Sequence, residues 1–178
     1  LTLIELIAVI AIIGVFGVVI ASFITSTANF YRHASDTANI QRNMQNTLES
    51  IENLILDTNQ SISYSYQADG RAVENDIGQN EAVEKLLVME SVTEDDKETV
   101  DVLRWRPGEQ KLYYIRNPQN YGTIYGDVLA ENVSGFNVDI SKARTEGVLR
   151  FQLSMTKRGE KITQTYTMAL RNQLGKES

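Results

Sequence analysis

Three patterns of hydrophobic and polar residues follow one another along the chain. The first covers residues 1–24, which contain a single ionisable side chain, Glu5, whereas every Lys and Arg lies at or beyond Arg32. As a helix, about 20 apolar residues cross the roughly 30 Å hydrocarbon layer of a bilayer. The first pattern therefore predicts one membrane-spanning helix.

The second pattern is that of an amphipathic helix. Its apolar residues recur at spacings of three or four, which places them on one helical face; they are Ile40, Met44, Leu48, Ile51 and Ile55. No Pro precedes Pro107 and no Gly lies between Gly17 and Gly70, so nothing obliges a break between the two segments. We expect one helix from about residue 2 to 58, ending in the turn-forming sequence DTNQS.

The third pattern is an alternation with period two that begins at Ser61 and predicts strands. Ile62, Tyr64 and Tyr66 share one face, and further strands are expected at 85–90, 100–106, 111–116, 124–130, 134–140, 148–156 and 162–170. Two hairpins are predicted around PGEQ and TKRGEK, and loops over Gln67–Glu84 and Ser91–Thr99.

The expected fold class is therefore α+β. A sheet with one apolar face needs a cover, and the apolar helical stripe is the long face that can supply it. We predict a hydrophobic transmembrane or filament-core helix over 1–30, and a globular head over 31–178. In the head, the amphipathic half of the helix packs on an antiparallel sheet of four or more strands.

Composition narrows the functions that the head can serve. From Arg32 onward, 17 basic and 22 acidic side chains give a net charge of −5, and the isoelectric point of the chain is about 4.9. An acidic surface has no general attraction for nucleic acid, so we predict no direct nucleic-acid binding. The chain has no cysteine, which excludes a disulfide, a thiolate zinc site and a cysteine nucleophile.

Glu5 is the most informative residue of the apolar segment. A carboxylate within a membrane helix costs several kcal/mol unless it is paired or protonated. The only positive charge nearby is the amine of Leu1, about one helical turn away. The pair can form within one chain or between neighbouring copies packed with an axial stagger. In the second case one buried charge pair per subunit fixes the stagger.

The start of the chain, LTLIELIAVIAIIG, resembles the N-terminus of mature type IV pilins and type II secretion pseudopilins. Those proteins open a long hydrophobic helix with an apolar first residue followed by the equivalents of Thr2, Leu3 and Glu5. The resemblance implies that a prepilin peptidase cuts just before Leu1 and methylates its amine, so we expect Leu1 to be a mature N-terminus. Two departures are the Leu at a position that is usually Phe, and Ser22 where many major pilins have a kinking Pro.

The head is similar to J-type minor pseudopilins and W-type minor pilins. The similarity lies in a strand pair VDVLRWRPGEQKLYYIR, then LAENVSGFNVDI with its apolar Val133, Phe136 and Val138, then a last strand pair. It implies a minor subunit that joins other minor and major pilins in a filament or its tip complex. The system served would be a pilus, competence or secretion pseudopilus. The resemblance further implies a single-pass protein of the cytoplasmic membrane with its head outside, and later a cell-surface or periplasmic filament.

Two other classes of protein fit the same pattern. One is a single-pass membrane-anchored extracellular binding domain with no filament role, and the other is an anchored extracellular hydrolase. No Gly-rich phosphate loop, G-x-S-x-G sequence or paired-carboxylate pattern occurs, so nothing favours an enzyme, and no cofactor is expected. A removable signal peptide is disfavoured, because such a leader starts with positive charge.

A few side chains carry weaker hypotheses. Gly14 and Gly17 could loosen the helix or allow close helix packing. Asp95 and Asp96 lie in an acidic run that suggests calcium, although Lys97 among them favours a solvated charge cluster. His33 is expected to be an exposed polar residue.

Aromatic residues on the expected strands could form a surface for sugar or DNA. On alternating strands such residues are more often core or cross-strand pairs, which is the interpretation that we prefer. They are Tyr64, Trp105, Tyr113 and Tyr114.

Overall fold

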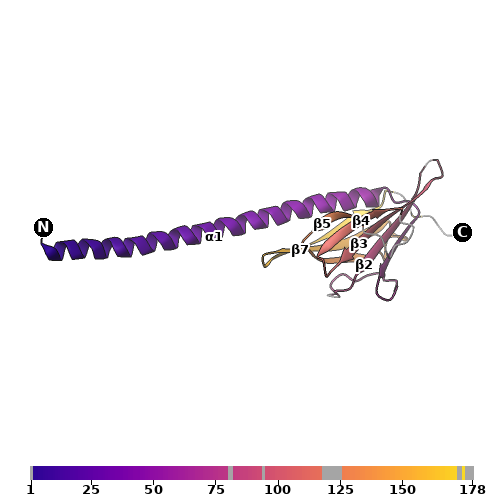
Figure 1. Ribbon diagram of the computed structural model, residues 1–178. Coiled ribbons are helices and arrows are strands. Elements are labelled where there is room, and N and C mark those ends of the chain that lie inside the picture. Colours follow the sequence, from indigo (N-terminus) through magenta and orange to yellow (C-terminus); the bar gives the residue numbers. More distant parts are fainter. Residues whose placement is uncertain (1, 80–81, 94, 118–125, 172–173, 175–178) are drawn as a thin grey trace. The chain divides into compact units, whose positions relative to one another are not determined.

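The computed structural model describes residues 2–79, 82–93, 95–117, 126–171 and 174. One helix, α1 (Leu3–Leu56), is followed within these residues by eight strands, so the fold class is α+β as predicted (Figure 1). The chain divides into two compact units, Leu1–Asn39 and Ile40–Ser178. We refer to the second unit as the head, and α1 contributes to both units.

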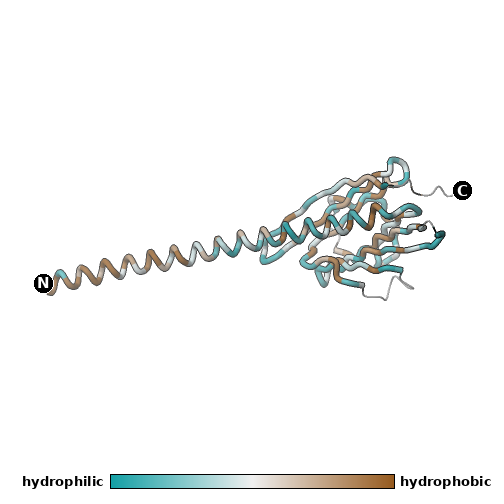
Figure 2. The backbone as a smooth tube through the Cα atoms, turned by 90° about the horizontal axis from the view of Figure 1, so that it is seen from above, coloured by the Kyte–Doolittle hydropathy of each residue, from teal (hydrophilic) through white to brown (hydrophobic). Residues whose placement is uncertain are grey.

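The continuous helix agrees with the prediction to within two residues at each end. It runs without interruption through Gly14 and Gly17. At its C-terminus, Thr58 closes the last turn by donating from its amide to the carbonyl of Ile55 (3.1 Å) and from its hydroxyl to that of Leu54 (3.1 Å). Figure 2 shows the change along α1 from a mainly hydrophobic first half to a mixed second half.

The apolar stripe of the second half is confirmed. Ile51 and Ile55 are completely buried, as is Met44, and Ile40 and Leu48 are nearly so. Thr47 lies beside them and is also buried, with its hydroxyl donating to the carbonyl of Asn43 (2.7 Å). The five apolar side chains of the stripe belong to one hydrophobic core that includes residues from both sheets of the head.

The strands form two antiparallel sheets, whereas the sequence predicted one sheet of four or more strands. The larger sheet has the order β1-β2-β3-β4-β5 and the smaller one β6-β7-β8. Their bounds are β1 (Ser61–Tyr66), β2 (Lys85–Val92), β3 (Glu98–Arg106), β4 (Lys111–Arg116), β5 (Asp127–Glu131), β6 (Val133–Asp139), β7 (Val148–Lys157) and β8 (Glu160–Ala169). Each predicted strand is thus present, although residues 124 and 125 of one prediction lie outside the described part.

Two predicted loops need correction. The expected loop Ser91–Thr99 is shorter, because Ser91 pairs with Thr99 and Val92 with Glu98 in the β2–β3 ladder. Backbone pairing does not require apolar side chains, so a polar stretch does not by itself end a ladder. The turn between β7 and β8 is also tight, since Lys157 pairs with Glu160. Its two central residues, Arg158 and Gly159, both have positive φ (50° and 89°), as in a type I′ hairpin.

A short segment at residues 71–76, within the predicted loop Gln67–Glu84, links the two sheets. On one side Ala72 bridges to Ser65 of β1, and on the other side Asn75 bridges to Asp139 of β6. Backbone amides continue both contacts, from Val73 to the Tyr64 carbonyl (2.8 Å) and from Asp76 to the Val138 carbonyl (3.1 Å). The linking segment therefore joins the free edge of β1 to the free edge of β6.

Candidate functional site

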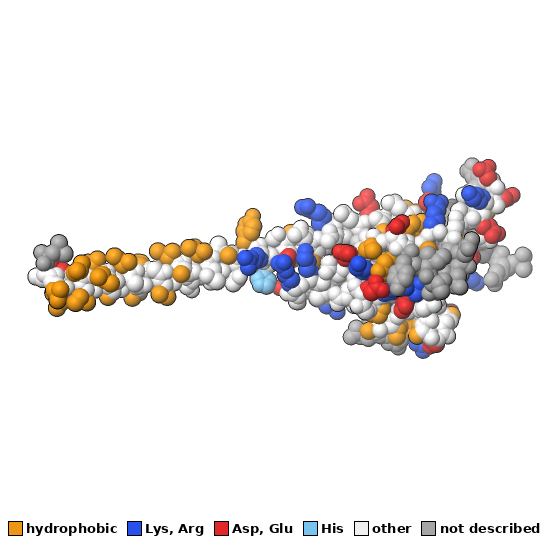
Figure 3. All heavy atoms as spheres, viewed as in Figure 1, with side chains coloured by type: hydrophobic (Ala, Val, Ile, Leu, Met, Phe, Trp, Pro, Cys, Tyr) orange, Lys and Arg blue, Asp and Glu red, His pale blue; other side chains and the backbone are white. Residues whose placement is uncertain are grey.

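The first unit exposes an apolar surface. All described residues from Thr2 to Ser35 are exposed, and the large apolar side chains between Leu3 and Tyr31 are 49–78% accessible (Figure 3). By length and composition this helix can cross a membrane, and it is the one such helix in the described part of the chain. A contiguous apolar surface of this size marks a membrane or protein interface. The structure is therefore compatible with single-pass anchoring.

Glu5 lies in the first turn of α1 and caps the helix. The amide of Thr2 donates to Glu5 Oε2 (2.8 Å), and the Thr2 carbonyl accepts from the amides of Glu5 (3.1 Å) and Leu6 (3.3 Å). This is half of a capping box, in which an acid three residues after the N-cap satisfies a free backbone N–H. An anion here also interacts favourably with the positive end of the helix dipole.

The capping contact was missed at the sequence level, although the spacing Thr-x-x-Glu was visible as a signal. Leu1 lies outside the described residues, so its processing and its pairing with Glu5 stay predictions. Gly14 and Gly17 are helical, and a methyl group added at either would meet no atom within 4 Å beyond its chain neighbours and the adjacent helix backbone. Packing within the chain therefore does not require either glycine, and their proposed flexibility also stays a prediction.

A second candidate site is a buried polar cluster in the head, centred on Asp76 and Lys85. Lys85 Nζ lies 2.5 Å from Asp76 Oδ2, and both side chains are completely inaccessible to solvent. Oδ2 also accepts from the hydroxyls of Tyr64 (2.8 Å) and Tyr66 (3.2 Å), while Oδ1 accepts from the amide of Val138 (2.8 Å). Burial, and then the charge of Asp76, raises the pKa of the Tyr64 phenol, which keeps the hydroxyl protonated as a donor.

The surroundings of Lys85 are aromatic on one side and polar on the other. Its Nζ lies 5.5 Å from the ring centre of Tyr66 and 5.4 Å from that of Trp105. It also donates to Asn137 Oδ1 on β6 (2.5 Å). Lys85 is the first residue of β2 and Asp76 lies in the linking segment, so the cluster forms where the two sheets meet. No pattern in the sequence points to this pair, because neither spacing nor periodicity relates a loop acid to the first residue of a strand.

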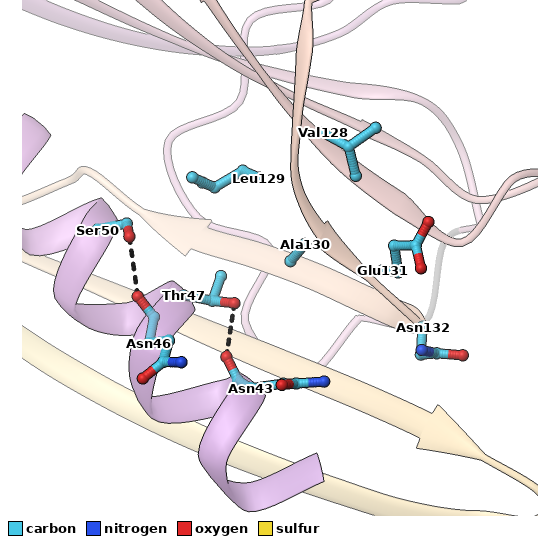
Figure 4. A pocket seen from close by; sticks show the side chains of 9 residues that line it. All are labelled: Asn43, Asn46, Thr47, Ser50, Val128, Leu129, Ala130, Glu131 and Asn132. Atoms are coloured by element: carbon cyan, nitrogen blue, oxygen red, sulfur yellow. Dashed lines mark hydrogen bonds between the residues drawn. The ribbon is translucent and has the colours of Figure 1, made fainter. Parts of the chain in front are cut away.

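A hollow of about 480 Å³ lies between the second half of α1 and β5 (Figure 4). It is lined by Asn43, Asn46, Thr47, Ser50, Val128, Leu129, Ala130, Glu131 and Asn132. The hydroxyls of Thr47 and Ser50 donate to helix carbonyls four residues earlier. Glu131 is the one ionisable side chain of this lining, so the hollow offers neither a pair of carboxylates nor an activated nucleophile.

The remaining candidates occupy ordinary positions. Among the residues that the structure describes, no three His, Asp or Glu side chains gather as metal ligands; Asp95 and Asp96 are described, whereas Glu94 is not. His33 is exposed, as predicted. The preferred interpretation of the aromatic residues is confirmed for Tyr64, Trp105 and Tyr113, which are buried, while Tyr114 is half-buried.

Comparison with protein-family models, with curated proteins and with solved structures gives no match. The fold and the site together define a class of protein: an α+β chain with an N-terminal helix that can span a membrane. Antiparallel β-sheets follow that helix.

Proposed function

We propose that this chain is a minor pilin or pseudopilin that assembles into a type IV filament, or into its tip or priming complex, through its N-terminal helix. The observation that carries the proposal is Glu5, an anion in the first turn of an exposed apolar helix. The type IV pilin fold, processing before Leu1 by a prepilin peptidase and assembly with other pilins belong to the same proposal. The head lies outside the cytoplasmic membrane before assembly.

Within the described residues, the capping contact fills only part of the hydrogen-bonding capacity of the Glu5 carboxylate. A carboxylate offers about four acceptor sites, and the Thr2 amide fills one of them with a neutral donor. The nearest basic side chain along the helix, Arg32, is about 40 Å away at 1.5 Å per residue. A counter-charge for Glu5 must therefore come from an N-terminal amine or from a partner molecule.

Side-by-side packing of apolar helices supplies both the adhesion and that counter-charge. When helices from several subunits leave lipid and pack together, their exposed apolar surfaces meet each other. An axial stagger then brings the Glu5 carboxylate of one subunit to the N-terminal amine of the next. Apolar contacts alone do not favour one stagger over another, whereas the charge pair forms at one stagger only. Buried polar groups can provide specificity in this way.

Two substitutions at Glu5 separate the helix cap from the charge. Glu5→Gln keeps an acceptor for the Thr2 amide, as the capping box allows, but removes the anion, whereas Glu5→Ala removes both. We expect both variants to insert into the membrane at wild-type levels and to lose incorporation into filaments or the minor-pilin complex. Ser22→Ala, at another exposed position of the same helix, serves as the control.

The measurement is the amount of subunit in sheared filaments or in the isolated complex, relative to the amount in membranes. Normal incorporation of Glu5→Gln together with failure of Glu5→Ala would show that the cap alone matters, and would refute the charge-pair account. The alternative function is an anchored binding domain that uses the hollow beside β5. Cysteine crosslinks between the spans of different subunits are expected only for the filament protein.

A further inference from the structure

Lys85 ends in a buried position between a carboxylate and a carboxamide. Its Nζ lies 2.5 Å from Asp76 Oδ2 and 2.5 Å from Asn137 Oδ1. An amine, an amide carbonyl and a carboxyl group thus meet in a place where the amine and the carboxyl group have no access to water. These three groups are the reactants and the acid-base catalyst that a transamidation requires.

We propose that Lys85 and Asn137 become joined by an intramolecular isopeptide bond, and that Asp76 transfers the protons. The bond would connect β2 of the five-stranded sheet to β6 of the three-stranded sheet. This inference concerns the head alone, and its test does not depend on whether the chain assembles into a filament.

The distances place the nucleophile against the electrophile. Because a C=O bond is about 1.2 Å long, Asn137 Cγ lies at most about 3.7 Å from Lys85 Nζ. Reacting atoms in near-attack geometries are about 3–3.5 Å apart, so a small shift suffices. The rings of Tyr66 and Trp105 lie beside Nζ and limit the room in which it can move away.

The orientation of the Asn137 amide suits the departure of its nitrogen. Nδ2 donates to the Gln79 carbonyl (3.1 Å) and to Gln152 Oε1 (3.3 Å), which leaves Oδ1 to face Lys85. The opposite orientation would place an N–H donor against an ammonium. Asn137 is partly accessible, so ammonia released from Nδ2 has a route to solvent.

The reaction is balanced without any other reactant. In the first step Asp76 takes one proton from the Lys85 ammonium, which frees the lone pair of the amine. The lone pair of the neutral amine attacks Asn137 Cγ and forms the new C–N bond. A second proton then passes from Nζ to Nδ2 through the Asp76 carboxyl group, the Cγ–Nδ2 bond breaks, and ammonia leaves. Nζ keeps one proton as the amide N–H, and nothing is oxidised or reduced.

A covalent link here would fasten the two sheets beyond the hydrogen bonds and the shared core that already hold them. The chain has no cysteine, so it cannot form a disulfide. Lys85 and Asn137 are 52 residues apart, and closing so long a loop restricts the unfolded chain considerably. The expected consequence is a head that resists heat and protease.

Peptide mapping of the full-length protein tests the proposal. The protein is purified in detergent, denatured and digested with trypsin. Trypsin does not cut after an acylated lysine, so the bond predicts a branched peptide in which residues 72–97 are joined to residues 117–142. Its mass is the sum of the two peptides less one ammonia, and fragmentation should place the branch at Lys85 and Asn137.

The unlinked protein gives a different digest. Cleavage after Lys85 then yields residues 72–85, 86–97 and 117–142 as separate linear peptides, and this result would overturn the proposal. Loss of ammonia within a linear peptide would also overturn it, since that is the product of asparagine cyclisation alone. The map does not depend on where the N-terminus of the chain lies.

Variants test the role of each group. Asp76→Asn should abolish the branched peptide while Asp76→Glu restores part of it, and a branched peptide at wild-type yield in Asp76→Asn would refute the role of Asp76. In case Asp76→Asn does not fold, Asn137→Ala removes the electrophile, together with the hydrogen bonds of that side chain, at a partly exposed position. It should lose the branched peptide and melt at a lower temperature. Thr167→Ala, at an exposed position of β8, is the control and should keep both properties.

Discussion

Replacing Tyr64 with Phe removes one hydroxyl from the buried polar cluster and leaves the ring in place. The Tyr64 side chain is 1% exposed, and its hydroxyl donates to Asp76 Oδ2 at 2.8 Å. A hydrogen bond to a charged group contributes about 1.5–3 kcal/mol. Because Lys85 and Tyr66 still donate to the same oxygen, the expected loss in the free energy of unfolding lies near the lower end, at about 1.5–2 kcal/mol.

Urea unfolding of the full chain in detergent measures this loss. The fluorescence of Trp105, the single tryptophan of the chain, reports on the head, because the indole is buried and donates to the Val133 carbonyl (2.9 Å). At a slope of about 2 kcal/mol per molar urea, the midpoint should fall by about 0.8–1 M. The matched control is Tyr166→Phe, since that hydroxyl is only half-buried and donates to Gln164, two residues away. Equal shifts for the two variants would refute the assigned importance of the cluster.

Two further predictions concern the packing of the helix and the response to alkaline pH. Ile51→Ala should destabilise the head by about 2–5 kcal/mol, because it leaves a cavity under α1. Glu52→Ala, on the exposed face of the same turn, should change the stability by less than about 0.5 kcal/mol. Urea unfolding measures both values, and similar losses for the two variants would contradict the observed packing. Burial, and then the hydrogen bond to Asp101, raises the pKa of Tyr114 from 10.0 to about 12. The stability that depends on this protonated phenol is complete below pH 10 and is lost as the pH rises to about 12, so Tyr114→Phe should flatten the alkaline decline in stability; an unchanged decline would contradict the assignment.

The sequence predicted the elements of this fold well because each element has its own periodicity. The stripe from Ile40 to Ile55 and the alternation around Phe151 are local patterns, and both residue sets are buried as expected. The division into two sheets could not be predicted in this way. It occurs at Asn132, the one residue between β5 and β6, whose φ is 62°. Asn tolerates that conformation, but its presence does not tell which strands pair beyond the turn.

The candidate sites differ in how far the sequence reveals them. Glu5 is conspicuous because its charge contrasts with an apolar segment, and its cap follows from the spacing to Thr2. Asp76 and Lys85 are conspicuous in neither respect, since Asp76 lies in a polar stretch and Lys85 follows Glu84 at the first position of a strand. Their burial results from the meeting of two sheets, which is a tertiary event. The sequence therefore offers no reason to single out either residue.

The linking segment, residues 71–76, determines how the head responds to a cut or an insertion at this place. Exposed strand edges attract other strands and lead to aggregation. Residues 71–76 cover an edge of each sheet at once, through Ala72 on β1 and Asn75 on β6. A proteolytic cut or an insertion in these six positions would uncover two adhesive edges together, and the head should then aggregate rather than lose a single contact.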